Sequence, residues 1–310
     1  MDMTPSVFPH PITQRVAGAR ALVLGGGGST GNAWLIGVVA GLVEAGLDVT
    51  QVDLIIGTSA GSTAAAQVTG ASPAALLGDI LSGAPQQRTG PVGSDRGPVP
   101  TRSVADHMGR LREIIASAHG PADLRRRMGA AALDMDAASD GSWQAQWRAT
   151  VASRLPSQQW PERSLLITAV DAKTGEPVVF DRHSGVDLAD AVAASCASGR
   201  SYRIGDSQYI DGGYRSNADN ADLAVGYAHV LVLSPLGGRS LTPAAWGTHL
   251  ATQIDALRAG GGTVDTIFPE SSAEYMFGAN AMDLSLRPAA AEAGRRQGRA
   301  WPTSQPGDRR

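Results

Sequence analysis

A serine lies between two glycines at the point where a predicted strand passes into a predicted helix. The stretch GTSAG at 57–61 directly follows a β-rich apolar run and precedes a helical one. A serine on such a tight turn has a strained backbone, and its hydroxyl is exposed at a helix N-terminus, where the helix dipole favours developing negative charge. Ser59 is therefore predicted to be a nucleophile, with Gly57 and Gly61 letting neighbouring elements pass close to the turn.

The same pattern occurs a second time, as GGSTG at 27–31. With 38 glycines in the chain, composition alone gives roughly 0.4 chance matches, so the pattern alone is a weak signal. Position decides between the two, because Ser59 directly follows its strand whereas Ser29 is separated from its strand by four glycines. We therefore favour Ser59 as the nucleophile over a serine that serves only the turn.

Four consecutive glycines, at 25–28, also need an explanation, because glycine loses the most conformational entropy on folding. With Gly31 they fit the dinucleotide-binding pattern GxGxxG, which expects an acidic residue about 20 positions later at the end of a second strand. Glu44 falls inside a predicted helix and Asp53 begins a strand, so neither fits well. A P-loop is excluded because no Gly-Lys-Ser/Thr follows. The other interpretation is an oxyanion hole, in which backbone N–H groups of the glycines bind the carbonyl oxygen that Ser59 attacks.

The nucleophile needs a base, and the sequence offers an aspartate and six histidines. Asp211 directly follows the predicted strand at 208–210, which places it at the carboxyl edge of the sheet, where ligands bind in open α/β folds. The dipeptide Asp-Gly is also a strong signal for a hairpin turn, so both interpretations of Asp211 stay open. A Ser–His–Asp triad through His229 or His249 stays open too. The other histidines lie in predicted loops or in a helical insertion: His10, His107, His119 and His183.

The elements that position these residues alternate between strands and helices. Two strand–glycine turn–helix units near the N-terminus indicate a three-layer α/β/α domain around a central, mostly parallel sheet. The predicted strands are 21–24, 52–56, 165–170, 177–181, 208–210 and 229–234. The predicted helices outside the insertion are 32–45, 62–68, 187–198, 243–260 and 288–297.

The domain organisation follows from changes in composition. We expect an N-terminal arm at 1–19, one α/β domain at 20–300 and a flexible tail at 301–310. Within the domain, a helical insertion at about 83–160 is expected to cover one edge of the sheet, and it opens with an aperiodic loop rich in Pro and Gly. Trp143 and Trp147, at helical spacing, make the insertion a candidate lid, although such tryptophans more often belong to a core.

Composition and charge exclude several classes of protein. The net charge of −3 argues against a nucleic-acid binder, and the single cysteine, Cys196, excludes a disulfide framework and a multi-cysteine metal site. Cys196 is predicted to be a buried structural thiol because small apolar residues surround it. No signal peptide and no run of about 18 apolar residues is found, so a soluble, cytoplasmic chain is expected. The arginine-rich tail is a candidate for peripheral contact with a membrane.

Three ordered segments of the sequence resemble the patatin-like phospholipase family, in its bacterial type. They are ALVLGGGGSTGNAWLIGVVAGL from residue 21, IIGTSAGS from residue 55 and AASCASGRSYRIGDSQYIDGGYRSNADNADLA from residue 193. The resemblance covers most of residues 20–235. Three motifs in the family's order are far more specific than any one of them.

The resemblance implies a patatin-like fold and a Ser–Asp dyad in place of a triad. In that scheme Ser59 is the nucleophile and Asp211 is the base that activates it. Gly26, Gly27 and Gly28 help to form the oxyanion hole. The implied activity is hydrolysis of lipid carboxyl esters, of the phospholipase A or lysophospholipase type, with no metal or organic cofactor.

The sequence departs from the family at Thr30, where the glycine loop usually carries Arg or Lys. Backbone N–H donors do not depend on that side chain, but the missing positive charge bears on the strength of the activity and on the preference among anionic substrates. Arg200 and Arg203, just ahead of Asp211, are candidates to supply charge near the site, with solvated surface arginines as the alternative.

Three other functions stay open at this stage. One is a triad esterase that uses His229 or His249, and replacement of each histidine would separate it from a dyad enzyme. A second is a nucleotide-binding protein whose glycine run holds a pyrophosphate. The third is a lipid-binding protein with little catalysis, which the threonine in the glycine loop suggests.

Overall fold

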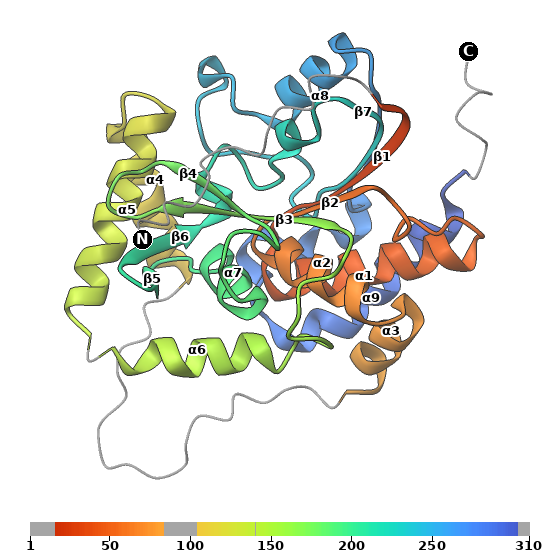
Figure 1. The fold of residues 1–310 in the computed structure, drawn as a ribbon, viewed down its shortest axis with the longest axis horizontal. Helices are drawn as coiled ribbons and strands as arrows, with labels where there is room; N and C mark the ends of the chain where they lie inside the picture. The colour runs from red at the N-terminus through yellow and green to blue at the C-terminus, as the bar shows by residue number, and fades with distance from the viewer. Residues whose placement is uncertain (1–15, 84–103, 140, 303–310) are drawn as a thin grey trace.

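A mixed sheet forms the middle layer of the structure, a computed structural model that describes residues 16–83, 104–139 and 141–302 (Figure 1). The described residues give eight strands: β1 (Val16–Leu24), β2 (Leu54–Gly57), β3 (Ser164–Asp171), β4 (Pro177–Phe180), β5 (Tyr202–Ile204), β6 (Ser207–Asp211), β7 (Tyr227–Leu233) and β8 (Thr263–Ile267). Their order is β5-β6-β3-β2-β1-β7-β8, with β4 paired to β3. Strands β3, β2, β1, β7 and β8 run parallel, whereas β4 and β6 run antiparallel to β3. The predicted α/β class with a mostly parallel central sheet is confirmed.

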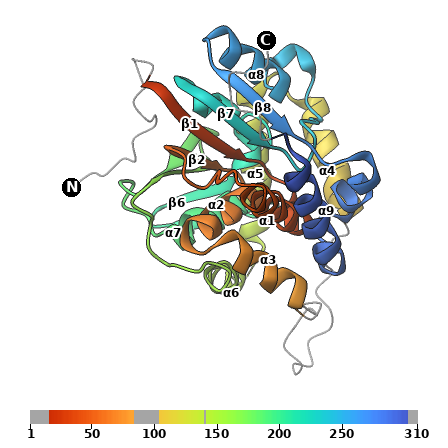
Figure 2. The same ribbon diagram turned by 90° about the vertical axis from the view of Figure 1, so that its right-hand side faces the viewer.

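Helices cover both faces of this sheet (Figure 2). One face carries α1 (Gly28–Glu44), α2 (Ala60–Gly70), α3 (Pro73–Ser82), α7 (Leu188–Ser195) and α9 (Arg287–Ala300). The other face carries α8 (Leu250–Ala259) and, near β3 and β6, α5 (Pro121–Ala137) with α4 (Val104–Ser117). Side chains alternate accordingly along β3, because Leu165 and Ile167 pack against the first layer while Leu166 and Val170 pack against the second.

Helices α1 and α9 are in direct backbone contact, which fixes the N-terminus of α1. A Cβ atom on Gly37 would lie 2.0 Å from the carbonyl oxygen of Ala291, so only glycine allows this approach. Because the glycine loop at 25–28 leads straight into α1, the C-terminal helix helps to determine where that loop lies.

The helices of the predicted insertion surround the β6 end of the sheet on both faces. Helix α5 places Leu124 and Met128 against Val170 and Ile210. Helix α6 (Ser142–Ala152) packs instead on α7, where the Trp147 indole N–H donates to the Ala193 carbonyl at 3.1 Å. Both tryptophans thus pack against the core, which agrees with the alternative to a lid. The aperiodic loop at 83–100 falls, apart from its first residue, outside the described residues.

Several predicted boundaries differ from the structure. Strand β1 begins at Val16, so the expected arm at 1–19 overlaps a strand and its remainder lies outside the described residues, as does most of the tail at 301–310. The predicted helix at 243–260 is wrong over its first part, because a single 3-10 turn is followed by Gly247 in the left-handed region at φ 68°, and α8 begins only at Leu250.

Strands β5 and β8 and helix α3 had not been predicted. Among the described residues, none of the helices has the length and apolar character needed to cross a bilayer.

Candidate active site

Ser59 occupies the sharp turn between β2 and α2 with φ 52° and ψ −119°, a conformation that is costly for a residue with a side chain. The glycines on either side are required by space. A Cβ on Gly61 would lie 1.9 Å from the Leu24 carbonyl oxygen, and one on Gly57 would lie 2.6 Å from the Cα of Ser62. The turn therefore packs against β1 and presents the half-buried Ser59 hydroxyl at the N-terminus of α2.

The backbone of Ser59 is held by α7 and the loop after it. Its N–H donates to Ser195 Oγ at 2.9 Å, and its carbonyl accepts from Ser62 Oγ at 2.6 Å and from Cys196 Sγ at 3.1 Å. Burial, with a smaller contribution from the charge on Asp211, raises the pKa of Cys196 to about 11, so the thiol stays protonated and can donate. Sequence reasoning did not find Ser195, since nothing local links it to the turn.

Asp211 reaches Ser59 because two strands that run in opposite directions end at neighbouring positions of β3. Strand β2 ends opposite Ile167, and the antiparallel strand β6 ends with Asp211 opposite Ala169. The Ser59 hydroxyl donates to Asp211 Oδ2 at 2.8 Å. The sequence had suggested the carboxyl edge of parallel strands, but β6 is antiparallel, so Asp211 reaches the site only because β3 extends beyond the end of β2.

The Asp211 carboxylate is buried, with 7% of the residue exposed, and the chain after it is not a hairpin. Oδ1 accepts the N–H of Gly213 at 2.8 Å as the chain enters the 3-10 turn Gly212–Tyr214. Burial raises the pKa of Asp211 to about 6, against the opposing hydrogen bonds from Gly213 and Ser59. The hairpin interpretation of Asp-Gly is therefore wrong, and the carboxylate is a stronger base than an exposed aspartate.

The histidines proposed for a triad lie elsewhere. His229 sits within β7, paired in register with Arg20 and Thr263, and His249 Nε2 lies 2.8 Å from the Thr242 carbonyl. In the part of the chain whose side chains are described, no histidine forms a hydrogen bond with Ser59 or Asp211.

The glycine loop lies directly against the nucleophile. A Cβ on Gly26 would be 3.5 Å from the Ser59 Cβ, while the Gly26 N–H donates to the Ala218 carbonyl at 2.8 Å. This bond contradicts the expectation that Gly26 supplies an oxyanion donor, because its amide is already used to anchor the loop. The N–H groups of Gly27 and Gly28 have no hydrogen-bond partner within the described residues.

A model of the patatin-like phospholipase family matches residues 22–224, a span that contains the glycine loop, Ser59 and Asp211. The chain belongs to the patatin-like phospholipase family. Comparison with curated proteins gives no match.

Among solved structures, the patatin-like chain is similar to VipD from Legionella pneumophila at 14% identity and a TM-score of 0.41, covering 92% of this chain and 66% of VipD. It is also similar to the type III effector protein ExoU at 17% identity and a TM-score of 0.36, covering 92% of this chain and 53% of ExoU. The chain therefore spans between about half and two thirds of the length of these two proteins.

Thr30, the departure from the family pattern, is fully buried and binds a segment from the C-terminal part of the chain. Its hydroxyl donates to the Met276 carbonyl at 2.8 Å. Positive charge comes instead from Arg287 at the start of α9, whose guanidinium donates to the Ser29 carbonyl at 2.7 Å and to Asn32 Oδ1 at 3.2 Å. Burial lowers the pKa of Arg287 to about 10, so it remains charged at neutral pH. Sequence reasoning missed this residue.

The two arginines proposed to supply that charge contact α6. The Arg200 guanidinium lies 5.7 Å from the ring centre of Trp143. The backbone of Arg203 exchanges hydrogen bonds with the side chain of Gln144, through its N–H at 3.0 Å and its carbonyl at 3.1 Å. Neither contact involves Ser59 or Asp211. The alternative of a solvated surface arginine fits the exposed Arg203, whereas Arg200 is half-buried against Trp143.

A second buried carboxylate, which the sequence did not suggest, packs against the glycine loop at Gly25. Asp219 is 2% exposed, and its Oδ1 has no hydrogen-bond partner within the described residues. This oxygen occupies the space beside Gly25, where a Cβ would come within 2.1 Å of it. Burial raises the pKa of Asp219 to about 7. Asp219 follows Ala218, whose carbonyl accepts the Gly26 N–H, so this carboxylate lies directly beside the segment that anchors the loop.

Proposed function

We propose that this chain is a serine acyl hydrolase that cleaves lipid carboxyl esters, of the phospholipase A or lysophospholipase type. The observation that carries the proposal is the 2.8 Å hydrogen bond from the Ser59 hydroxyl to Asp211, beside a glycine loop, in a member of the patatin-like phospholipase family. A lipid ester is the substrate class that this family implies.

In the proposed mechanism Asp211 takes the proton of the Ser59 hydroxyl while its oxygen attacks the ester carbonyl. The carbonyl oxygen becomes an oxyanion, which the N–H groups of Gly27 and Gly28 stabilise. The carbon–oxygen bond to the alcohol then breaks, and the alcohol leaves with the proton held by Asp211. Water, activated by the same carboxylate, releases the acyl group from Ser59.

The surroundings of both groups support these roles. A pKa of about 6 leaves Asp211 ionised at neutral pH yet makes it a better proton acceptor than an exposed aspartate. Donors such as Gly27 and Gly28 typically contribute a hundredfold to a thousandfold each to the rate, roughly, when they point at the developing charge. The N-terminus of α1, where Arg287 binds, adds positive potential to the same side of the loop.

The nucleotide-binding alternative fits the structure less well. A pyrophosphate would have to lie over the glycine loop, but Ser59 lies against Gly26 there, and the Gly26 N–H is already bound to Ala218. Retention of bound nucleotide on purification would favour that alternative.

Labelling with a fluorophosphonate probe tests the proposal. We expect the wild-type chain to be labelled and Ser59→Ala to be unlabelled, with Asp211→Asn labelled much more slowly. His229→Ala and His249→Ala are the matched controls and should keep most of the rate on a short-chain ester. An unlabelled wild-type protein with a normal circular dichroism spectrum would contradict the hydrolase proposal. Loss of activity in either histidine variant would point to a triad.

A further inference from the structure

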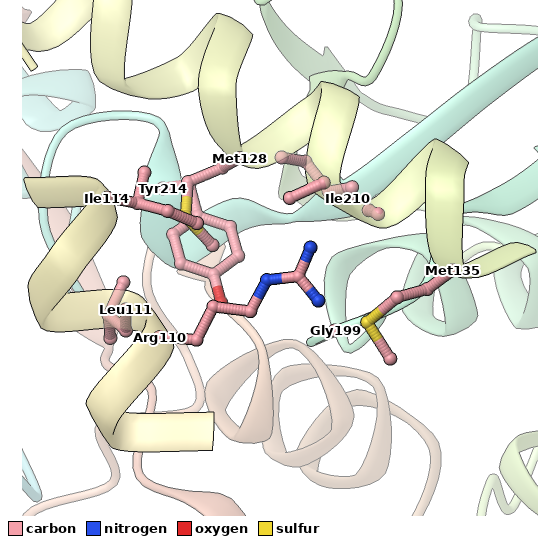
Figure 3. Close-up of a pocket in the computed structure, with 10 residues that line it drawn as sticks. Arg110, Leu111, Ile114, Met128, Met135, Gly199, Ile210 and Tyr214 are labelled. Atoms are coloured by element: carbon pink, nitrogen blue, oxygen red, sulfur yellow. The ribbon is translucent and has the colours of Figure 1, made fainter. Parts of the chain in front are cut away.

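An apolar pocket lies next to Asp211, between α4, α5 and the end of β6 (Figure 3). Leu111 and Ile114 line it from α4, Met128 and Met135 from α5, and Tyr214 from the turn after Asp211. Its volume is about 30 Å³, and the pocket is partly open to the surface. A space of that size holds about one water molecule.

The pocket is coupled to the reacting groups through short stretches of backbone. Its lining residue Ile210 immediately precedes Asp211, and Gly199 lies two residues after Ala197, whose carbonyl accepts the Asp211 N–H at 3.0 Å. The pKa of Tyr214 is raised to about 12 by burial and, in second place, by the negative charge on Asp211, which reflects how near the two groups lie.

Arg110 is the one charged side chain among the residues that line the pocket. Figure 3 shows it reaching from α4 past the ring of Tyr214, with its guanidinium turned toward Met135. It is half-buried, and within the described residues it makes no hydrogen bond or ion pair. An unpaired guanidinium beside apolar side chains is available to bind an anionic group.

Several other half-buried arginines of this chain have polar partners. Arg125 donates to the carbonyls of Gly175 and Arg215, and Arg215 itself binds Asp222 at 2.9 Å. Among the half-buried arginines that the structure describes, Arg110 and Arg200 lack such partners, and Arg200 lies instead over the Trp143 ring.

We propose that this pocket binds an amphiphile that consists of one alkyl chain and one anionic group, with the chain among the methionines and the anion on Arg110. The proposal rests on the proposed function and names its substrate class, namely a lipid with a single chain and a negatively charged oxygen. The carboxylate of a released fatty acid and the phosphate of a lysophospholipid share this chemistry.

Entry of a chain requires the pocket to widen, and its lining is suited to that. Methionine has three rotatable bonds and an unbranched, polarisable side chain, so it adapts to irregular apolar ligands. Met128 and Met135 lie at the two ends of the pocket wall that α5 provides, so we expect rotation of both side chains to accompany entry of a chain.

Calorimetric titration of the Ser59→Ala variant, which cannot turn over, tests the proposal. The probes share a twelve-carbon chain: dodecanoate, dodecyl phosphate and the neutral dodecyl maltoside, each below its micellar concentration. We expect the better of the two anions to bind about tenfold or more tighter than the neutral probe, which is the effect of a hydrogen bond to a charged group. Carboxylate preference identifies the fatty acid as the ligand, and phosphate preference identifies the lysophospholipid.

Two further variants separate charge from packing. Arg110→Gln should remove the preference for the anions while the neutral probe binds as before, and Arg112→Gln, an exposed arginine on the same helix, should change nothing. Ala131→Phe, which fills the pocket, should weaken all three probes alike. Equal binding of anionic and neutral probes, or an unchanged preference in Arg110→Gln, would overturn the proposal. Fluorophosphonate labelling of the wild type is a separate readout, so failure of the pocket and failure of the hydrolase function are distinguishable.

Discussion

Replacement of Asp211 by asparagine should make the protein more stable at neutral pH while it removes the activity. In the folded state the pKa of Asp211 is about 6, against 3.8 as its ordinary value, and burial is the main cause. The folded protein therefore binds this proton more tightly than the unfolded chain does. The ionised carboxylate then costs stability as pH rises from about 4 to about 6, and the whole cost is present at pH 7.

The size of this cost follows from the two pKa values. A pKa that moves from 3.8 to about 6 corresponds to about 3 kcal/mol of folding free energy at pH 7. Asparagine keeps the shape, its amide oxygen can accept the Gly213 N–H, and its amide group faces the Ser59 hydroxyl. We therefore expect a gain of roughly 1–3 kcal/mol at pH 7 that shrinks toward zero at pH 4.

Urea denaturation of both proteins between pH 4 and pH 8 measures this difference directly. Asp206→Asn, at an exposed turn just before β6, is the matched control and should show no such dependence on pH. Loss of the general base should lower the rate on an ester by about a hundredfold to ten thousandfold. A stability difference that is independent of pH would refute the reasoning, because burial of the charge would then not be what limits stability.

Three further changes address the turn, the loop and the second buried carboxylate. Gly61→Ala places a methyl group 1.9 Å from the Leu24 carbonyl and should destabilise the fold by about 3 kcal/mol or more, measured as a fall in the urea midpoint. Arg287→Gln removes the charge bound to the Ser29 carbonyl and should lower kcat about tenfold with little change in KM, whereas Arg287→Lys should recover part of it; an effect on KM alone would contradict a role at the loop. Asp219→Asn should raise Tm at pH 8 and leave it nearly unchanged at pH 4. Burial raises the pKa of Asp219 from 3.8 to about 7, so its ionisation costs stability as pH rises between these two values. An equal shift of Tm at both pH values would count against this account.

The local part of the site could be predicted from the sequence, and the long-range part could not. The turn at Ser59 is encoded by neighbours, since an apolar run and two glycines four residues apart fix its strand, its tight turn and its helix. Asp211 is different, because its partner lies 152 residues away and its own neighbourhood is equally typical of a hairpin. Only the resemblance of three ordered motifs favoured the base, and the antiparallel course of β6 was not foreseen.

The errors in secondary structure also have local causes. The run at 243–260 is apolar enough to suggest one helix, but Gly247 takes a left-handed conformation and ends the first turn. Strand β8, with the sequence TVDTI, buries only two of its five residues at the edge of the sheet, so it lacks the continuous apolar pattern of the inner strands.

The glycine loop depends on parts of the chain that lie beyond the family match at 22–224. A Cβ on Gly27 would lie 2.6 Å from Pro235, and Gly28, at φ 67°, has the Ala281 carbonyl 2.8 Å from its own Cβ position. Together with Arg287, which is 258 residues from its partner Ser29, these contacts clamp the loop from the C-terminal third of the protein. Donors that must already point at the oxyanion before it forms need such external support, because four glycines have no rigidity of their own. The motifs thus specify which atoms react, and the C-terminal segment holds the loop in the position that the reaction requires.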